Sequence, residues 1–128
     1  GDIGVVVGGT GSYGPYLADG LSATGVGAEL NDPQDIALGP TGALVLSDGF
    51  MHVIRVVPAR SGPLFGRMMT AGDLYTVAGA LPVETAEGAG DGTRWVTTHM
   101  GTPTGVTVNP AGSVVYCDAA SGAVVRLG

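Results

Sequence analysis

The sequence contains no lysine, and its five basic residues are all arginines, scattered along the chain. Eleven acidic residues outnumber them, so the net charge at neutral pH is −6. Nucleic-acid affinity comes mostly from clustered lysine and arginine side chains. The charge balance therefore argues against a phosphate-binding surface, and we expect no nucleic-acid partner.

Cysteine and long apolar runs are scarce as well. Cys117 is the only cysteine, so no disulfide can form within the chain. It lies in the alternating apolar run SVVYCD, where we expect a small buried side chain rather than a reactive thiol. No apolar run approaches the ~18 residues that cross a bilayer, so we expect no membrane segment. The sequence does not determine the cellular compartment, and an extracellular or cell-surface location is slightly favoured.

Glycine and apolar residues are abundant instead, with 24 glycines and a hydrophobic content of 45%, which argues against disorder. An internal repeat organises them, because residues 31–57 match residues 101–127 without a gap, 70 positions apart. A shorter match, 71 positions apart, joins GDIGVVVGG at the start to GDLYTVAGA at residues 72–80. The matched pairs include Pro33 with Pro103, Ile36 with Val106, Leu38 with Val108, Asp48 with Asp118, Ile3 with Leu74, and Gly8 with Gly79.

Each repeat reads as a series of β-strands, because apolar residues alternate with a period of two. GPTG (39–42) and NPAG (109–112) have the composition of type I turns between strands. We name the successive strands a, b, c and d. The sequence predicts strand d at about 3–7, strands a-b-c-d at about 35–78, and strands a-b-c at about 105–127, within one domain spanning 1–128.

Two further expectations follow from the strand pattern. Asp48 and Asp118 open polar turns, where an aspartate can accept hydrogen bonds from nearby backbone amides, so we expect structural rather than catalytic roles for them. The second expectation concerns the core. The residues predicted to be buried on the sheet faces are Ile36, Leu38, Leu44, Leu46, Val106, Val108, Val114 and Tyr116.

The repeat resembles the NHL repeat, a blade of a β-propeller. PTGVTVNPAGSVVYCDAASGAVVRL and YTVAG match the family pattern well, PQDIALGPTGALVLSDGFMHVIRVV matches it less well, and LADGLSATGVGAELNDP looks like the family's connector. The resemblance implies an all-β propeller with four-stranded antiparallel blades, two to a chain. Val53 and Ala123 replace an arginine of the family's third strand, which weakens the case for the RNA contacts that some members make.

Two blades cannot close a ring, and an isolated pair leaves two apolar blade faces exposed. Cyclic association of identical chains would cover them. We expect a homotrimer with six blades, the number that the resemblance implies to be commonest, rather than a tetramer with eight. The run at 3–7 would complete the a-b-c sheet of another copy. The alternative is that these residues are one third of a longer propeller.

The long d–a connections, about residues 9–32 and 80–102, are expected to lie at the same end of the blades as the b–c turn DGFMH. This end concentrates the aromatic residues of the chain, and the alternative is that they fill the gaps between blades. The candidate ligand-binding residues are Tyr13, Tyr16, Phe50, His52, Arg94, Trp95 and His99.

Catalytic motifs are scarce. No pair of residues has metal-ligand spacing, and the sequence has no Ser-His-Asp arrangement and no phosphate loop followed by a helix. We therefore predict no catalytic residue, no metal and no cofactor. The favoured function is a non-catalytic binding or scaffold module that recognises a protein, peptide or glycan. The alternatives are a metal-dependent propeller lyase or hydrolase and a purely structural module.

Overall fold

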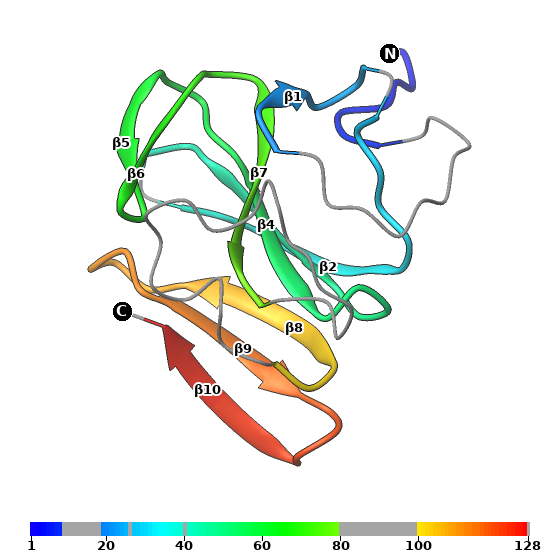
Figure 1. Ribbon diagram of the computed structural model, residues 1–128, viewed down its shortest axis with the longest axis vertical. Helices are drawn as coiled ribbons and strands as arrows, with labels where there is room; N and C mark the ends of the chain where they lie inside the picture. The colour runs from blue at the N-terminus through cyan, green and yellow to red at the C-terminus, as the bar shows by residue number, and fades with distance from the viewer. Residues whose placement is uncertain (9–18, 26, 40, 80–99, 128) are drawn as a thin grey trace.

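The computed structural model describes residues 1–8, 19–25, 27–39, 41–79 and 100–127, and within these ranges all regular structure is β-strand (Figure 1). Five strands form the first sheet in the order β1 (Leu21–Ser22), β7 (Asp73–Ala78), β4 (Val53–Val57), β3 (Leu44–Asp48) and β2 (Pro33–Leu38). Three form the second sheet in the order β10 (Ala123–Leu127), β9 (Val114–Asp118) and β8 (Pro103–Val108). A hairpin of β5 (Gly62–Leu64) and β6 (Arg67–Met69) stands apart from both sheets.

Every strand pairing within the described residues is antiparallel, which confirms the predicted all-β class. In the first sheet β2, β3, β4 and β7 are successive neighbours, in the order in which the sequence predicts strands a, b, c and d. In the second sheet β8, β9 and β10 follow in the same way, as predicted for a, b and c. No helix in the described ranges is long and apolar enough to span a membrane.

The repeat recurs in the backbone geometry of the two sheets. The amide of Gly42 donates to the carbonyl of Gly39 at 2.9 Å, and the matched amide of Gly112 donates to the carbonyl of Asn109 at 2.8 Å. Gly42 and Gly112 have matched φ angles of 81° and 89°, in the left-handed region that glycine adopts without strain. Each sheet also has an irregularity in its first strand, just after the matched residues Pro33 and Pro103.

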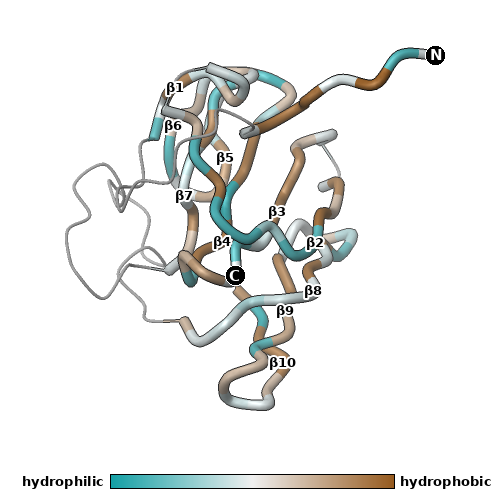
Figure 2. Tube along the Cα trace, turned by 90° about the vertical axis from the view of Figure 1, so that its right-hand side faces the viewer, coloured by the Kyte–Doolittle hydropathy of each residue, from teal (hydrophilic) through white to brown (hydrophobic). Residues whose placement is uncertain are grey.

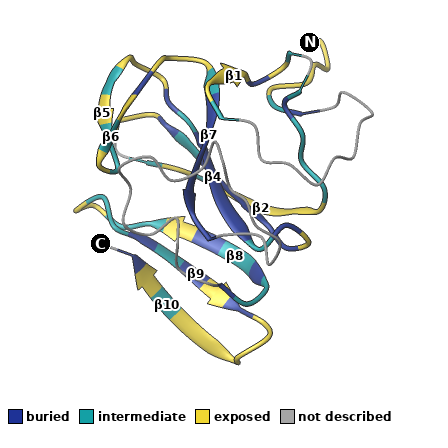
Figure 3. Cartoon of the chain, viewed as in Figure 1, coloured by how far each residue is buried: buried dark blue, intermediate teal, exposed yellow. Residues whose placement is uncertain are grey.

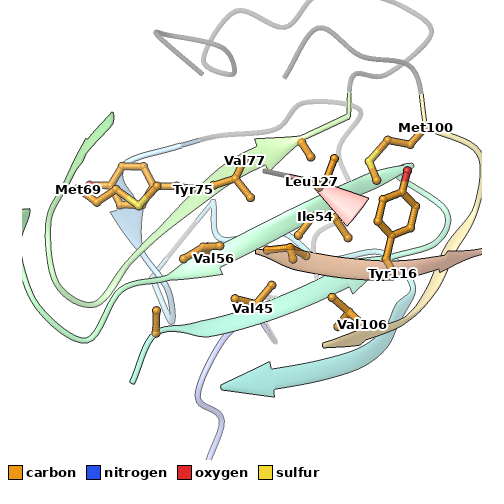
Figure 4. Close-up of a cluster of buried hydrophobic side chains, with 13 residues drawn as sticks. Val45, Ile54, Val56, Met69, Tyr75, Val77, Met100, Val106, Tyr116 and Leu127 are labelled. Carbon is orange, nitrogen blue, oxygen red and sulfur yellow. The ribbon is translucent and has the colours of Figure 1, made fainter. Parts of the chain in front are cut away.

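The two sheets pack face to face around one apolar cluster (Figure 4). Alternate residues of β3 and β4, namely Val45, Ile54 and Val56, point toward the second sheet and are fully buried. Val106 and Tyr116 meet them from β8 and β9. We call the side of the first sheet that carries Ile54 its front face, and the opposite side, which carries Ile36, its back face. By the repeat, the second sheet has its back face at Val106 and its front face at Val124.

The predicted core is correct for the second sheet but partly wrong for the first (Figure 3). Val106, Val114, Tyr116 and Leu46 are buried, and Val108 and Leu44 are half-buried. Ile36 and Leu38, in contrast, are 62% and 70% exposed. Ala37 lies between them in β2 and packs against the main cluster, so the alternation places its two neighbours on the back face, where no described segment covers them.

Cys117 also departs from expectation, because its side chain is exposed rather than buried. It lies in β9 opposite Val124 of β10, on the front face of the second sheet. Val124 is 72% exposed. The front face of the second sheet therefore presents apolar side chains to solvent in the single chain.

Residues 3–7, predicted to be a strand, form none in this structure. We call residues 1–6 the N-terminal arm. Figure 2 shows the arm projecting from the body of the chain with hydrophobic stretches along it. Ile3 is fully exposed, and Val5 and Val6 are 63% and 71% exposed. Only the base of the arm is held, because Val7 packs beside Leu74 and the amide of Gly8 donates to the carbonyl of Ala23 at 2.8 Å.

Candidate functional site

The turn between β3 and β4, residues 49–52, is held by the carboxylate of Asp48. Its oxygens accept hydrogen bonds from three backbone amides, those of Asn31 (2.7 Å), Asp32 (3.1 Å) and Met51 (3.0 Å). The first two amides belong to the end of the long d–a connection. The carboxylate therefore joins this connection to the turn, and the two lie at the same end of the sheet, as predicted.

Asp118 does the same in the second sheet. Its carboxylate accepts from the amides of Thr102 and Ala120, each at 2.9 Å, and from the hydroxyl of Ser121 at 2.8 Å. These hydrogen bonds, the one from the Ser121 hydroxyl foremost, lower the pKa of Asp118 below its ordinary value. Thr102 and Asp32 are matched residues of the repeat, so both aspartates have the structural role that the sequence predicts.

Two of the predicted binding residues lie on this turn, and they differ in exposure. The ring of Phe50 is 64% exposed at the tip. His52 is half-buried, and its Nδ1 lies 2.7 Å from the carbonyl oxygen of Gly101. Because a carbonyl only accepts, Nδ1 is the donor in this contact. His52 therefore joins the turn to the segment before β8, and Phe50 is the side chain that faces solvent.

The remaining predicted binding residues lie outside the described residues. These are Tyr13, Tyr16, Arg94, Trp95 and His99. Within the described ranges, no three His, Cys, Asp or Glu side chains are grouped closely enough to hold a metal ion. The described part of this surface therefore offers an aromatic contact on a turn whose carboxylate is engaged by backbone amides.

A buried charge cluster, which the sequence analysis did not predict, lies on the back face of the first sheet. Asp19 accepts hydrogen bonds from the amide and hydroxyl of Thr76 at 2.8 and 2.9 Å and from Arg67 at 2.9 Å. The guanidinium of Arg55 lies 3.6 Å from Asp19 and donates to the carbonyl of Glu29 at 3.2 Å. Arg55 and Asp19 are 1% and 3% exposed. The cluster joins the connection at 19–32 to β4, β6 and β7.

Burial has the largest effect on the ionisation of this cluster. It raises the pKa of Asp19, although the Thr76 amide and Arg55 act in the opposite direction. It lowers the pKa of Arg55, against the stabilising charge of Asp19. One signal in the sequence points to this site, because an arginine inside the apolar run VIRVV needs a partner when the strand is buried.

A small apolar cavity lies at the opposite end of the two sheets. Its volume is about 230 Å³, and Phe65, at the tip of the β5–β6 hairpin, forms part of its wall. Phe65 and Gly66 have φ angles of 51° and 83°, as in a type I′ turn, an unusual conformation for an aromatic residue. The other described lining residues are Gly39, Thr41, Ala43, Val45, Leu64, Val108, Pro110, Ala111 and Gly112.

Comparison with known proteins gives a likeness of fold alone. No protein-family model and no curated protein sequence matches the chain. The structure is similar to the crystal structure of a structural genomics protein of unknown function from Bacteroides thetaiotaomicron, with a TM-score of 0.63 and 20% sequence identity. The match covers 88% of this chain and 24% of that one, so this chain spans about a quarter of its neighbour's length.

Proposed function

We propose that the chain is a non-catalytic binding or scaffold module, built as two blades of a β-propeller of the kind that the NHL resemblance implies. The observation that carries the proposal is the state of the β3–β4 turn. Asp48 and His52 are engaged by the backbone around them, and Phe50 alone presents a large apolar side chain to solvent. With the Asp48 carboxylate occupied and an aromatic ring exposed, this turn favours recognition by contact.

The ligand class is a protein, a peptide or a glycan. Aromatic side chains provide large contact areas at low entropic cost and stack on the apolar faces of sugars and peptides. A turn that is held by several backbone hydrogen bonds presents such a ring in one position, which lowers the entropic cost of binding. The proposed binding surface comprises this turn and the long connections predicted to lie beside it.

The blades are proposed to close a six-bladed ring from three copies. Support comes from the two outer faces of the sheet pair, which carry exposed apolar side chains such as Leu38 and Val124. Light scattering is expected to give the mass of three chains of 12.6 kDa. A stable monomer would overturn this part of the proposal and leave the binding part standing.

The binding part is tested with the purified chain on a glycan array and a peptide library. For the best hit, Phe50→Ala is expected to weaken binding by about 2 kcal/mol, roughly 30-fold in Kd. Trp95→Ala, within the predicted binding surface, is expected to act alike. Met68→Ala is the matched control, because Met68 is 71% exposed on the β5–β6 hairpin at the other end of the sheets.

Three results would contradict the proposal. The first is no specific ligand in either screen, and the second is equal loss of binding in the Phe50 and Met68 variants. The third is a stoichiometric metal ion in the purified protein together with metal-dependent lyase or hydrolase activity, which would favour the catalytic alternative.

A further inference from the structure

Matched residues of the two repeats can be compared in two environments, one covered by the neighbouring sheet and one exposed. Val106 is buried against the first sheet, but the matched Ile36 is 62% exposed. Ile54 is fully buried against the second sheet, but the matched Val124 is 72% exposed. The contact inside the chain is a front face packed on a back face. One front face, and the β2 side of one back face at Ile36 and Leu38, are left uncovered.

Cys117 and its repeat match show the same contrast in a polar contact. The matched residue is Ser47, which is fully buried and donates its hydroxyl hydrogen to the carbonyl of Thr104 across the two sheets. Cys117 occupies the equivalent place on the front face of the second sheet and is exposed. At these two positions the uncovered front face therefore corresponds to a face that is buried inside the chain.

The edge of the second sheet lacks a strand that the first sheet has. In the first sheet β7 pairs with β4, the third strand of its repeat. The matched third strand is β10, and no described residue pairs with its outer edge. The segment that matches β7 in sequence is 2–7. Gly79, just after β7, and Gly8, at the base of the arm, share φ angles of 90° and 76°.

The arm cannot complete β10 of its own chain. Val7, at its base, packs beside Leu74 and Leu30, in the cluster that includes the 19–32 connection. β10 lies on the other side of the first sheet, where Leu127 joins the main cluster. Figure 1 shows the N-terminus and β10 at opposite ends of the view. Within the described residues, the outer edge of β10 therefore has no partner strand.

We infer that the partner is a second copy of this chain, which contributes residues 3–7 as the fourth strand beside β10. The back face of the same copy, at Ile36 and Leu38, covers Cys117 and Val124 of the first. This inference rests on the proposed ring and specifies its contacts. Both surfaces are supplied by one copy, because the base of its arm packs on the back face of its own first sheet, the face that also carries Ile36 and Leu38.

The register of the new strand pair follows from the β4–β7 pair. There Arg55 lies opposite Thr76, and Val56 lies opposite Tyr75. The residues that match β4 are found by adding 70, and those that match β7 by subtracting 71. This places Val125 opposite Val5, and Arg126 opposite Gly4. Ile3 and Val5 then lie on the back face of the second sheet, which packs inside the receiving chain, just as the buried Leu74 and Thr76 lie on the back face of the first sheet. Front face meets back face in each contact, so the interface is head-to-tail, the kind that forms a ring when the rotation between copies closes.

Disulfide cross-linking tests this register. In a Cys117→Ser background, the pair Val5→Cys and Val125→Cys places two thiols directly opposite, where Cβ atoms of antiparallel strands are close enough for a disulfide. Mild oxidation is expected to convert most of the protein to covalent dimers and trimers on a non-reducing denaturing gel. The matched control pairs Val5→Cys with Val124→Cys, whose side chains point to opposite faces and are expected to remain uncross-linked.

A second measurement uses the unaltered chain and so does not depend on how the variants fold. Alkylation of Cys117 is expected to be slow in the assembled protein, because Ile36 and Leu38 of the next copy cover it. Removal of residues 1–6 is expected to release a monomer in which Cys117 reacts as fast as an exposed thiol.

The measurements distinguish failure of the proposed register, of the proposed covering face and of the proposed ring. A trimer by mass in which the control pair cross-links, or neither pair does, overturns the proposed register and leaves the ring in place. Fast alkylation of Cys117 in a trimer overturns the proposed covering face. A monomer by mass overturns both this inference and the proposed ring, and loss of ligand binding in Phe50→Ala alone affects neither.

Discussion

At Gly79 only a hydrogen atom fits in place of a side chain. A Cβ there would overlap the carbonyl oxygen of His52 and approach the sulfur of Met100, and the φ angle is 90°. Gly112 has nearly the same φ angle, 89°, but nothing lies within 4 Å of the position that its Cβ would take. The two residues separate the effect of backbone conformation from that of close packing.

Alanine at these two glycines is expected to lower the free energy of unfolding unequally. Gly112→Ala should cost about 1–2 kcal/mol, because it meets only the strain of a left-handed conformation. Gly79→Ala should cost roughly 1–3 kcal/mol more, because the backbone or Met100 must move. Urea unfolding of both variants measures the difference, and equal losses would mean that β4 and the residues after β7 are not in close contact.

Asp118 should make stability depend on pH in one direction. Its folded pKa lies below the ordinary value of 3.8, so its contribution is present above that value and is lost as the pH falls through the folded pKa. Asp118→Asn should cost about 1.5–3 kcal/mol at pH 7, and this difference should shrink below pH ~4. The measurement is denaturant unfolding at several pH values, with Asp2→Asn in the exposed arm as control. A loss independent of pH would show that the charge contributes nothing.

At the scale of elements, β2 and β8 show one strand pattern in two environments. Both alternate apolar residues in the same register of the repeat, yet Val106 is buried and Ile36 is exposed. The difference arises from what lies beyond each back face. The first sheet lies behind β8, whereas the connection at 19–32 covers the back face near β7 and Leu74 and leaves the β2 edge open.

The matched pair Ile54 and Val124 should therefore separate folding from association. Ile54→Ala is expected to lower the free energy of unfolding by about 2–5 kcal/mol, because it opens a cavity at the centre of the main cluster. Val124→Ala should change the unfolding of the single chain little but weaken the trimer. Unfolding and mass are measured on each variant. A trimer unaffected by Val124→Ala would contradict the proposed seam.

The connection at 19–32 depends on its buried charges. Asp19→Ala removes the acceptor of Thr76 and Arg67 and leaves the charge of the fully buried Arg55 without its carboxylate, which should cost about 3–5 kcal/mol. Replacing both members, as in Asp19→Leu with Arg55→Leu, should recover part of that loss, because no lone charge remains buried. Thermal unfolding of the two variants gives the comparison; a double variant no more stable than Asp19→Ala would contradict the pairing of the two charges.

The described part of the chain combines a buried seam between its sheets with an uncovered front face, a partly uncovered back face and an exposed arm. Its solved neighbour is about four times as long, consistent with the same strand arrangement forming part of a larger one. In the proposed ring three copies supply that larger arrangement. Folding and association are then linked, because the apolar faces of each chain are buried only in the assembly.

This linkage predicts that thermal stability rises with protein concentration. A folded state that requires association gains stability by mass action, so the Tm of the full chain should increase over a hundred-fold range of concentration. The chain without residues 1–6 should show a Tm that is independent of concentration. A concentration-independent Tm for the full chain would argue against reversible assembly.

The sequence by itself determined the strands of the two repeats (β2–β4 and β7–β10), their order and several local contacts. A period of two and a repeat 70 residues long are sufficient for strand positions, because alternation and turn composition are local properties. The roles of Asp48 and Asp118 were predictable for the same reason, since their partners include amides two and three residues ahead. The position of Phe50 on an outward turn also followed from its place between two strands.

The tertiary structure decided which of two equivalent faces is covered. Alternation divides a strand into two sides but does not say which side meets another layer, so Ile36, Leu38 and Cys117 were expected to be buried and are exposed. The pairing of Asp19 with Arg55 was decided in the same way. It depends on where the 19–32 connection crosses the sheet, and 36 residues separate the two side chains in the sequence. Contacts of this range depend on how the layers pack, which no local pattern encodes.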